Sequence, residues 1–143
     1  DSMARAVGMS VPVSTKATIE ICTFIRGKLT SEAKKMLEEV IEQKRAVPYR
    51  VFHKGLSHKR KIGPGKFPEK ACGEVIKIIE GAEANSQVKG LNTANLVIKH
   101  INAHLAGKQW HYGRKRRRRA KRTHIEIVVQ ERKAEKTEKK AKK

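Results

Sequence analysis

The sequence of 143 residues has few cysteines, few aromatic residues (4%) and no long apolar run. Its two cysteines, Cys22 and Cys72, each fall within an apolar helical pattern, which argues against a disulfide framework and favours a reducing compartment. No apolar run reaches the roughly 18 residues of a transmembrane helix, and the amino end lacks the charged start and apolar core of a secretory signal. These absences predict one small, soluble, intracellular domain.

Acidic residues are also scarce, and the basic residues that outnumber them are concentrated. The chain has 34 Lys and Arg against 14 Asp and Glu, a formal net charge of +20. Residues 44–70 hold nine basic residues and one acid, and residues 108–122 hold nine and none, whereas residues 1–43 and 71–107 are balanced. Like charges at this density repel unless a polyanion neutralises them, so we expect an anionic partner. We expect the two cationic segments to lie on opposite sides of a neutral core.

Apolar residues recur at helical spacing in three segments. The clearest is Ser31–Glu42, which Thr30 or Ser31 can cap. A second helix is predicted to open at Ser14 and to stop at Gly27. A third is predicted from about Pro68 to Val88.

After the third helix the apolar period changes to two, which predicts strands. Residues 96–105 and 123–130 alternate in this way, with Leu105 on the inward face, and residues 4–13 can add an edge strand. The basic segment between the two long strands then becomes the end of an extended hairpin, about residues 95–130, with an arginine tip. The predicted fold is α+β, with about three helices packed on a small antiparallel sheet in one domain, residues 1–130. Residues 131–143 are predicted to be a disordered basic tail.

No group of residues has the spacing that catalysis or metal binding requires. Gly63-Pro64-Gly65-Lys66 lacks the longer spacing and the following Ser or Thr of a phosphate-binding loop, so we predict a basic turn. His100 and His104 fall on one side of a strand but about 13 Å apart, too far to share a metal. The two cysteines are predicted to be buried core thiols. We therefore expect no enzyme activity, cofactor or metal.

The basic segments instead favour nucleic-acid binding. The run from Arg114 to Arg122 is preceded by Trp110 and Tyr112, and both guanidinium groups and aromatic rings stack on unpaired bases. The alternatives for this run are a solvated charged segment or a nuclear-import-like signal. Residues 44–70 are predicted to form a long loop that a partner orders. Membrane adsorption is disfavoured because neither basic segment has a matching apolar helical face.

Several motifs occur in an order that resembles one ribosomal protein family. The most diagnostic is Gly113-Arg114, followed after nine residues by His124-Ile125-Glu126-Ile127-Val128-Val129. From about Ala4 to Gln130 the chain is similar to the universal large-subunit ribosomal protein family numbered twenty-two in bacteria and seventeen in eukaryotes. Its basic insert around Lys54–Phe67 resembles the archaeal and eukaryotic branch. The other matching motifs are Arg5-Ala6, Val13-Ser14-Thr15-Lys16-Ala17, Ile25-Arg26-Gly27-Lys28, Ala33-Lys34-Lys35-Met36-Leu37-Glu38, Gly81-Ala82-Glu83-Ala84-Asn85 and Lys89-Gly90-Leu91.

The resemblance implies a cytoplasmic structural constituent of the large ribosomal subunit that binds ribosomal RNA. It also implies a body at the subunit surface and a hairpin that borders the nascent-peptide exit tunnel, although the arm from His104 to Arg114 is shorter than in the family. The implied partners are ribosomal RNA, neighbouring ribosomal proteins and the nascent polypeptide. A free-standing architectural DNA- or RNA-binding protein is the alternative function.

The predicted RNA-binding residues come from the two basic segments and, near the body's RNA-facing side, from the resemblance. They are Lys16, Arg26, Lys28, Lys44, Arg45, Lys54, Lys59, Arg60, Lys61, Lys66, Lys108, Trp110, Arg114, Lys115, Arg116, Arg117, Arg118, Arg119, Lys121 and Arg122.

Overall fold

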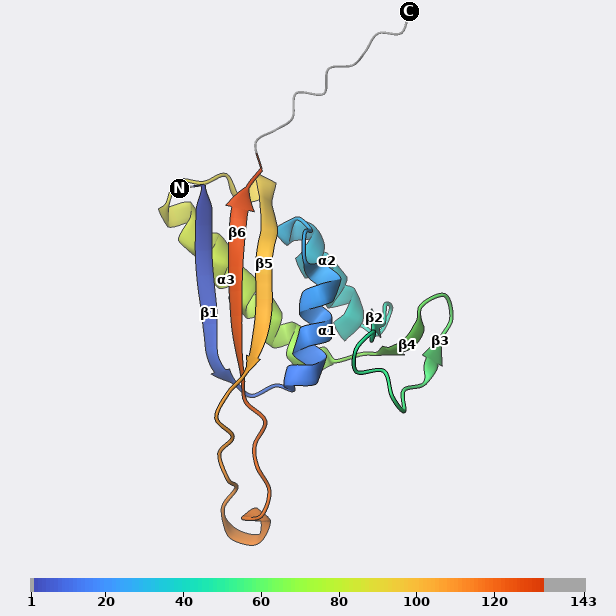
Figure 1. Cartoon of the computed structure of the whole chain (residues 1–143). Helices are drawn as coiled ribbons and strands as arrows, with labels where there is room; N and C mark the ends of the chain where they lie inside the picture. The colour runs from blue at the N-terminus through green and yellow to red at the C-terminus, as the bar shows by residue number, and fades with distance from the viewer. Residues whose placement is uncertain (1, 133–143) are drawn as a thin grey trace, which may run out of the picture.

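The main sheet has three antiparallel strands in a computed structural model that describes residues 2–132 (Figure 1). The strands are β1 (Met3–Val11), β5 (Leu96–Leu105) and β6 (Thr123–Glu131), in the order β1-β6-β5. The predicted α+β class, the edge strand and the two alternating strands are confirmed. Glu131, the first residue of the predicted tail, belongs instead to β6 and pairs with Leu96. The rest of that tail, from 133 onward, lies outside the described residues.

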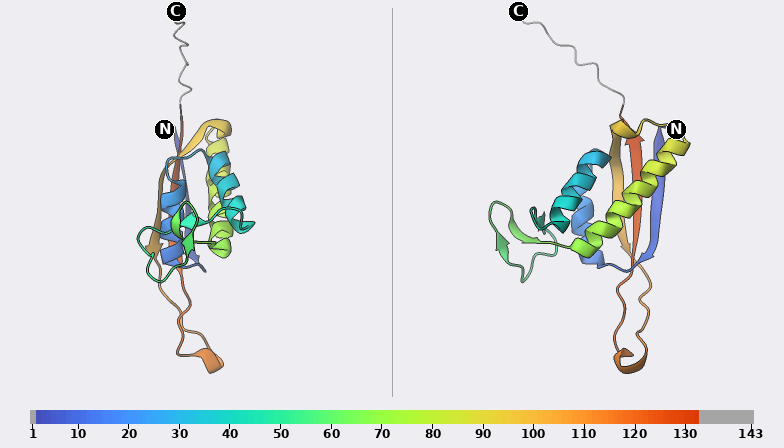
Figure 2. Two further views of the ribbon diagram at one scale, coloured as in Figure 1. Left: turned by 90° about the vertical axis from the view of Figure 1, so that its right-hand side faces the viewer. Right: turned by 180° about the vertical axis from the view of Figure 1, so that it is seen from behind.

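Three helices pack against this sheet. They are α1 (Thr15–Ile25), α2 (Thr30–Ile41) and α3 (Glu69–Val88). Helix α3 crosses one face of the sheet over β1 and β6, α2 packs against α3, and α1 lies along the β5 edge (Figure 2). Their apolar stripes and the inward faces of the strands form one buried core, which includes Ile21, Leu37, Ile79, Ile101 and Ile127.

The start of α2 differs from the prediction. Thr30 is the first residue of the helix and is buried, Leu29 is the N-cap residue, and no side chain caps the helix. The cause is tertiary, because the turn before α2 pairs with the edge of β5. Gly27 N–H donates to Ile98 O at 2.9 Å, and Ile98 N–H donates to Lys28 O at 2.9 Å.

A bulge in β5 changes which residues face the core. The register shifts between Ile98 and His100, so that Ile98 and Ile101 are both buried although they are three residues apart. Leu105 follows the buried Ile101 and Ala103 in the same alternation, but it is the last residue of the strand and is 65% exposed. An extra residue in one strand reverses which positions face the core beyond that residue. The alternation of apolar and polar residues does not show where the extra residue lies.

Part of the segment 44–70 forms a second small sheet where a loop was predicted. Its strands are β2 (Val47–Pro48), β3 (His58–Lys59) and β4 (Gly63–Lys66), in the order β2-β4-β3. The predicted basic turn at 63–66 is therefore a strand. A Cβ at Gly65 would lie 3.2 Å from Val47 O, so the absence of a side chain allows this close pairing.

The hairpin continues beyond the end of the main sheet, at the bottom of Figure 1. Its arms run from 106 to 122 and are joined by a few backbone hydrogen bonds, such as His111 N–H to Arg118 O at 2.9 Å and Ala120 N–H to Gln109 O at 2.8 Å. A 3-10 turn, Gly113–Lys115, forms the tip. The bond from His111 to Arg118 encloses residues 112–117, so Arg114, Arg116 and Arg117 lie in the tip, as predicted, and Arg118 and Arg119 begin the arm that returns to the sheet.

Candidate nucleic-acid interface

The hairpin presents its cationic side chains to solvent. Between 108 and 122 there is no acidic residue, and nearly every side chain of that stretch is exposed. The Arg119 guanidinium lies 4.1 Å from the centre of the Trp110 ring, and the two residues form a backbone bridge across the arms. This stacking, a cation–π contact, holds the arms together and leaves the other arginines free to reach a partner. The exposed predicted residues here are Lys108, Trp110, Arg114, Lys115, Arg116, Arg117, Arg118, Arg119 and Lys121.

The root of the hairpin is tied to the body. Arg122 donates from Nη1 to Ser10 O at 3.2 Å, so this predicted RNA-binding residue also has a structural contact. Thr123 is fully buried, donates to Val13 O at 3.1 Å, and its hydroxyl lies 2.8 Å from the Thr15 hydroxyl. These contacts fix the position at which the hairpin leaves the body.

Four predicted residues line a cavity of about 440 Å³ beside the second sheet: Lys44, Arg45, Lys59 and Arg60. Phe24, Ile62 and Phe67 form its apolar wall, and Lys59 Nζ lies 5.4 Å from the centre of the Phe67 ring. Two of the cations have acidic neighbours. Lys44 pairs with Glu42 at 2.7 Å, which raises the pKa of the lysine, and Arg45 pairs with Glu39 at 2.9 Å.

Four other predicted lysines, Lys16, Lys54, Lys66 and Lys121, line a second cavity of about 570 Å³. They come from α1, from both ends of the segment between 54 and 66, and from the hairpin. The two cationic segments therefore meet at the hairpin root, and the expectation that they lie on opposite sides of the core is wrong. The reason is that the contact between Thr123 and Thr15 places the hairpin root beside the first turn of α1. Residues 49–56 lie beside the same turn.

A buried carboxylate shapes this second cavity. Glu20 is 2% exposed and accepts backbone N–H groups from three consecutive residues: Arg50 at 3.1 Å, Val51 at 2.9 Å and Phe52 at 2.8 Å. Burial, together with the nearby Glu20 charge, raises the pKa of Tyr49 to about 12. Glu20 thus holds the turn that carries the cavity's aromatic wall.

Two predicted body residues lie elsewhere and are already engaged. Arg26 donates from Nη2 to Ile101 O at 2.9 Å, and Lys28 pairs with Glu32 at 2.9 Å. Both follow the carboxyl end of α1, while Lys16 lies in its first turn. Lys61 is exposed in the turn between β3 and β4, where its φ is +71°. The structure therefore does not bring Arg26 and Lys28 together with Lys16.

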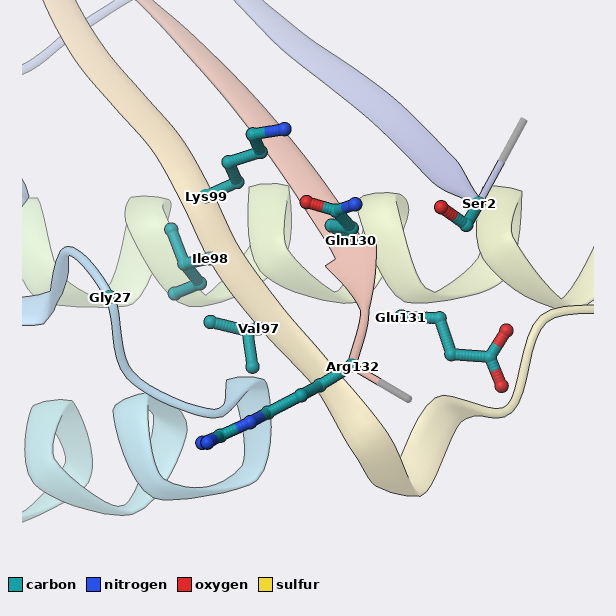
Figure 3. Close-up of a pocket in the computed structure, with 8 residues that line it drawn as sticks. All are labelled: Ser2, Gly27, Val97, Ile98, Lys99, Gln130, Glu131 and Arg132. Atoms are coloured by element: carbon teal, nitrogen blue, oxygen red, sulfur yellow. The ribbon is translucent and has the colours of Figure 1, made fainter. Parts of the chain in front are cut away.

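A third cavity, of about 550 Å³, lies at the end of the main sheet away from the hairpin. Figure 3 shows Val97 and Ile98 of β5 on one side of it, with the Glu131 and Arg132 side chains pointing in opposite directions. It also contains Lys99, so both charge signs are present. None of the predicted RNA-binding residues lines this cavity.

The cysteines and histidines that were considered for catalysis or metal binding are either buried in the core or bonded to Glu126. Both cysteines are buried free thiols, and burial raises the pKa of each to about 12. His100 and His104 both contact Glu126 Oε1, at 2.9 and 3.3 Å, so their side chains converge more than the strand spacing predicted. Across residues 2–132 no three His, Cys, Asp or Glu side chains are placed to hold a metal. None of the helices described has the length and apolar character needed to cross a membrane.

The family model of ribosomal protein L22p/L17e matches residues 6–130, which is most of the chain. The chain belongs to the ribosomal protein L22p/L17e family. A relative from Methanopyrus kandleri, named large ribosomal subunit protein uL22, is 41% identical over 138 residues, which cover 90% of this chain and 87% of the relative. The proteins of the same name from Staphylothermus marinus (39% over 140 residues, 90% and 89% covered) and Archaeoglobus fulgidus (45% over 103 residues, 70% and 66% covered) are also similar.

Within this L22p/L17e chain, sequence reasoning missed three residues that shape the interface. Glu20 interrupts an otherwise apolar stretch of helix, a signal of a buried acid with a local partner. Phe52 is an aromatic residue inside a basic segment, the same signal that singled out Trp110. Thr123 had no distinguishing signal, because its role depends on a neighbour 108 residues away.

Proposed function

We propose that this protein is a structural constituent of the large ribosomal subunit and that its two cationic segments bind ribosomal RNA. Membership of the L22p/L17e family supports this, as do the similar proteins named large ribosomal subunit protein uL22. A place in the large subunit implies ribosomal RNA and neighbouring ribosomal proteins as partners. The function is scaffolding, and the family is not one of enzymes.

One observation carries the RNA-binding part of the proposal: the hairpin 106–122 extends beyond the sheet with its arginines exposed and without any acidic residue. Beyond its root, this segment loses conformational entropy on ordering without burying a core. Contact with a polyanion compensates, because each neutralised phosphate releases condensed counterions. Guanidinium groups also match the paired oxygens of a phosphate.

The shape of the protein fits a place between RNA helices. The hairpin and the small sheet project from the body in two directions (Figures 1 and 2), so cations reach more than one RNA segment at once. RNA helices repel one another through their phosphates, and a rigid cationic insert lowers that repulsion. We also propose that the hairpin borders the path of the nascent polypeptide, which its narrow two-armed form and exposed tip favour.

The predicted residues contribute unequally to this proposal. The exposed hairpin cations and the lysines around the hairpin root are available to phosphates. Arg26 and Lys28 already bond within the chain, and Lys44 and Arg45 already pair with glutamates. We therefore assign these four a smaller share of the binding free energy.

Sedimentation of a native cell extract through a sucrose gradient, at moderate and then at high salt, tests the function. The protein is expected to migrate with large subunits and to remain with them after the salt wash, since an inserted hairpin contacts many phosphates. Release into the soluble fraction, or migration with DNA, would contradict a ribosomal role and support the architectural DNA- or RNA-binding alternative.

A further inference from the structure

The cavity at the hairpin root has the size and composition of a ligand site. Its volume of about 570 Å³ lies within the usual range of about 300–1,000 Å³ for small-ligand pockets. Tyr49, Val51, Phe52 and Leu56 contribute apolar surface, and lysines surround it. An apolar wall with cations around it matches a ligand that has both a flat apolar part and negative charge.

The four lysines of this cavity are not paired with acids, since the Glu20 carboxylate, one helical turn from Lys16, accepts from the backbone of residues 50–52 instead. No lining residue is acidic, and within residues 2–132 neither Lys16, Lys54, Lys66 nor Lys121 forms an ion pair. Elsewhere on the body the lysines at 28, 34, 44 and 77 each pair with a glutamate. Four like charges around one hollow repel until an anion enters, so this cavity favours a negatively charged occupant.

Phe52 offers a stacking surface inside the cavity. Its side chain is half-buried, Lys16 Nζ lies 5.5 Å from the ring centre, and the neighbouring Val51 is 66% exposed. Bases stack on aromatic rings, and an RNA helix keeps its bases paired and stacked inside, so only an unpaired base can reach a ring set in a hollow.

The wall is held in place before any ligand arrives. The three N–H bonds to the buried Glu20 carboxylate fix residues 50–52, and Thr123 fixes the hairpin root that carries Lys121. A preformed site spares the ordering cost of binding.

We propose that this cavity binds one unpaired nucleotide of the RNA, with its base against Phe52 and its phosphates near Lys54, Lys66 and Lys121. The inference rests on the proposed RNA-binding function and adds to it a specific subsite. That subsite joins the two cationic segments on a single strand of RNA, so the hairpin and the small sheet are docked together.

The test uses the full chain and large-subunit ribosomal RNA. Phe52→Leu keeps apolar volume but removes the ring, and we expect an affinity loss of about 5- to 150-fold, the range for removal of one base–aromatic stack. Ultraviolet irradiation of the wild-type complex is expected to give a nucleotide adduct on the peptide that contains Phe52, and the variant is expected to lack it. Urea unfolding of Phe52→Leu checks that the fold remains.

A charge variant keeps the proposal testable if Phe52→Leu does not fold. The double variant Lys54→Gln and Lys66→Gln is expected to lower the slope of log affinity against log salt by about two, one for each phosphate that a lysine neutralises. The matched control, Lys35→Gln and Lys77→Gln, removes the same charge from the exposed surfaces of α2 and α3 and is expected to leave the slope unchanged.

The outcomes separate this subsite from the general function. If both cavity variants bind like wild type and no adduct forms, while replacement of Arg116–Arg119 by alanine weakens binding, the subsite is wrong and RNA binding stands. If the wild-type chain does not bind the RNA, both the subsite and the proposed function are wrong.

Discussion

The hydroxyl groups of Thr15 and Thr123 lie 2.8 Å apart, joining the first turn of α1 to the first residue of β6. Thr123 is fully buried, and its hydroxyl also donates to Val13 O. The arm that follows the hairpin tip enters the sheet at Thr123, so this contact sets where the hairpin leaves the body. It also brings Lys121 beside the lysines of the small sheet.

Thr123→Val tests the strength of this connection. The change keeps the side-chain shape but leaves the Val13 carbonyl and the Thr15 hydroxyl without their buried partner. We expect the free energy of unfolding to fall by about 1–3 kcal/mol, measured by urea denaturation. The control is Thr23→Val, whose hydroxyl bonds to Ile19 O at an exposed position and whose effect is expected within about 0.5 kcal/mol. Equal effects of the two changes would contradict a special role for the buried threonine.

Glu20→Gln tests the buried carboxylate. A glutamine has one acceptor oxygen, and its amide group would face N–H donors, so at least one of the three backbone bonds cannot form. We expect destabilisation of about 1.5–3 kcal/mol and faster amide hydrogen exchange at residues 50–52. The exposed Glu38→Gln on α2 serves as the control. Unchanged exchange at 50–52 would show that other contacts hold this turn.

Replacement of Arg116–Arg119 by alanine is expected to weaken RNA binding and to loosen the hairpin arms through loss of the Arg119–Trp110 contact. The free energy of unfolding of the body is expected to stay unchanged, since all four side chains are exposed. The slope of log affinity against log salt should fall by about one for each phosphate that is no longer neutralised. Trp110 is the single tryptophan of the chain, so its fluorescence reports on the hairpin during an RNA titration. A lowered free energy of unfolding in this variant would mean that the arginines also support the fold.

The Glu126 carboxylate stabilises the folded state to an extent that depends on pH. Hydrogen bonds from His100 and His104 hold the pKa of its carboxyl below the ordinary value of 4.5. The folded state therefore binds fewer protons than the unfolded state over this interval, and the stabilisation is present above pH 4.5 and lost as the pH falls through the lower, folded pKa. The free energy of unfolding of wild type minus that of Glu126→Gln is expected to shrink as the pH falls below 4.5. A constant difference would contradict the lowered pKa.

The two thiols are expected to be unreactive in the folded protein. Burial raises the pKa of Cys22 and of Cys72 to about 12, so almost no thiolate is present near neutral pH. Iodoacetamide is expected to label neither cysteine in the native protein and both in urea, with mass spectrometry as the readout. Rapid labelling of either native thiol would show that its helix opens locally.

Local patterns in the sequence were sufficient for the main elements. The helical stripes of α1 and α3 and the alternation of β6 each identify the buried face in advance, because a side chain's direction follows from the helical or extended repeat. The clustering of charge was equally evident from the sequence, since the nine cations of residues 108–122 can be counted without a structure. The alternation in β5 was less reliable, because the bulge after Ile98 changes the face and alternation does not reveal where an extra residue sits.

The sequence by itself therefore determined the fold class, the order of the main elements and the presence of two cationic segments. Only the tertiary structure decided that these segments meet, that part of residues 44–70 is a sheet, and that Arg26 and Lys28 bond within the chain. The physical reason is range. Periodicity and charge density act among neighbours along the chain, whereas the contacts of Thr123 with Thr15, of Glu20 with Phe52, and of Arg26 with Ile101 join residues 108, 32 and 75 positions apart.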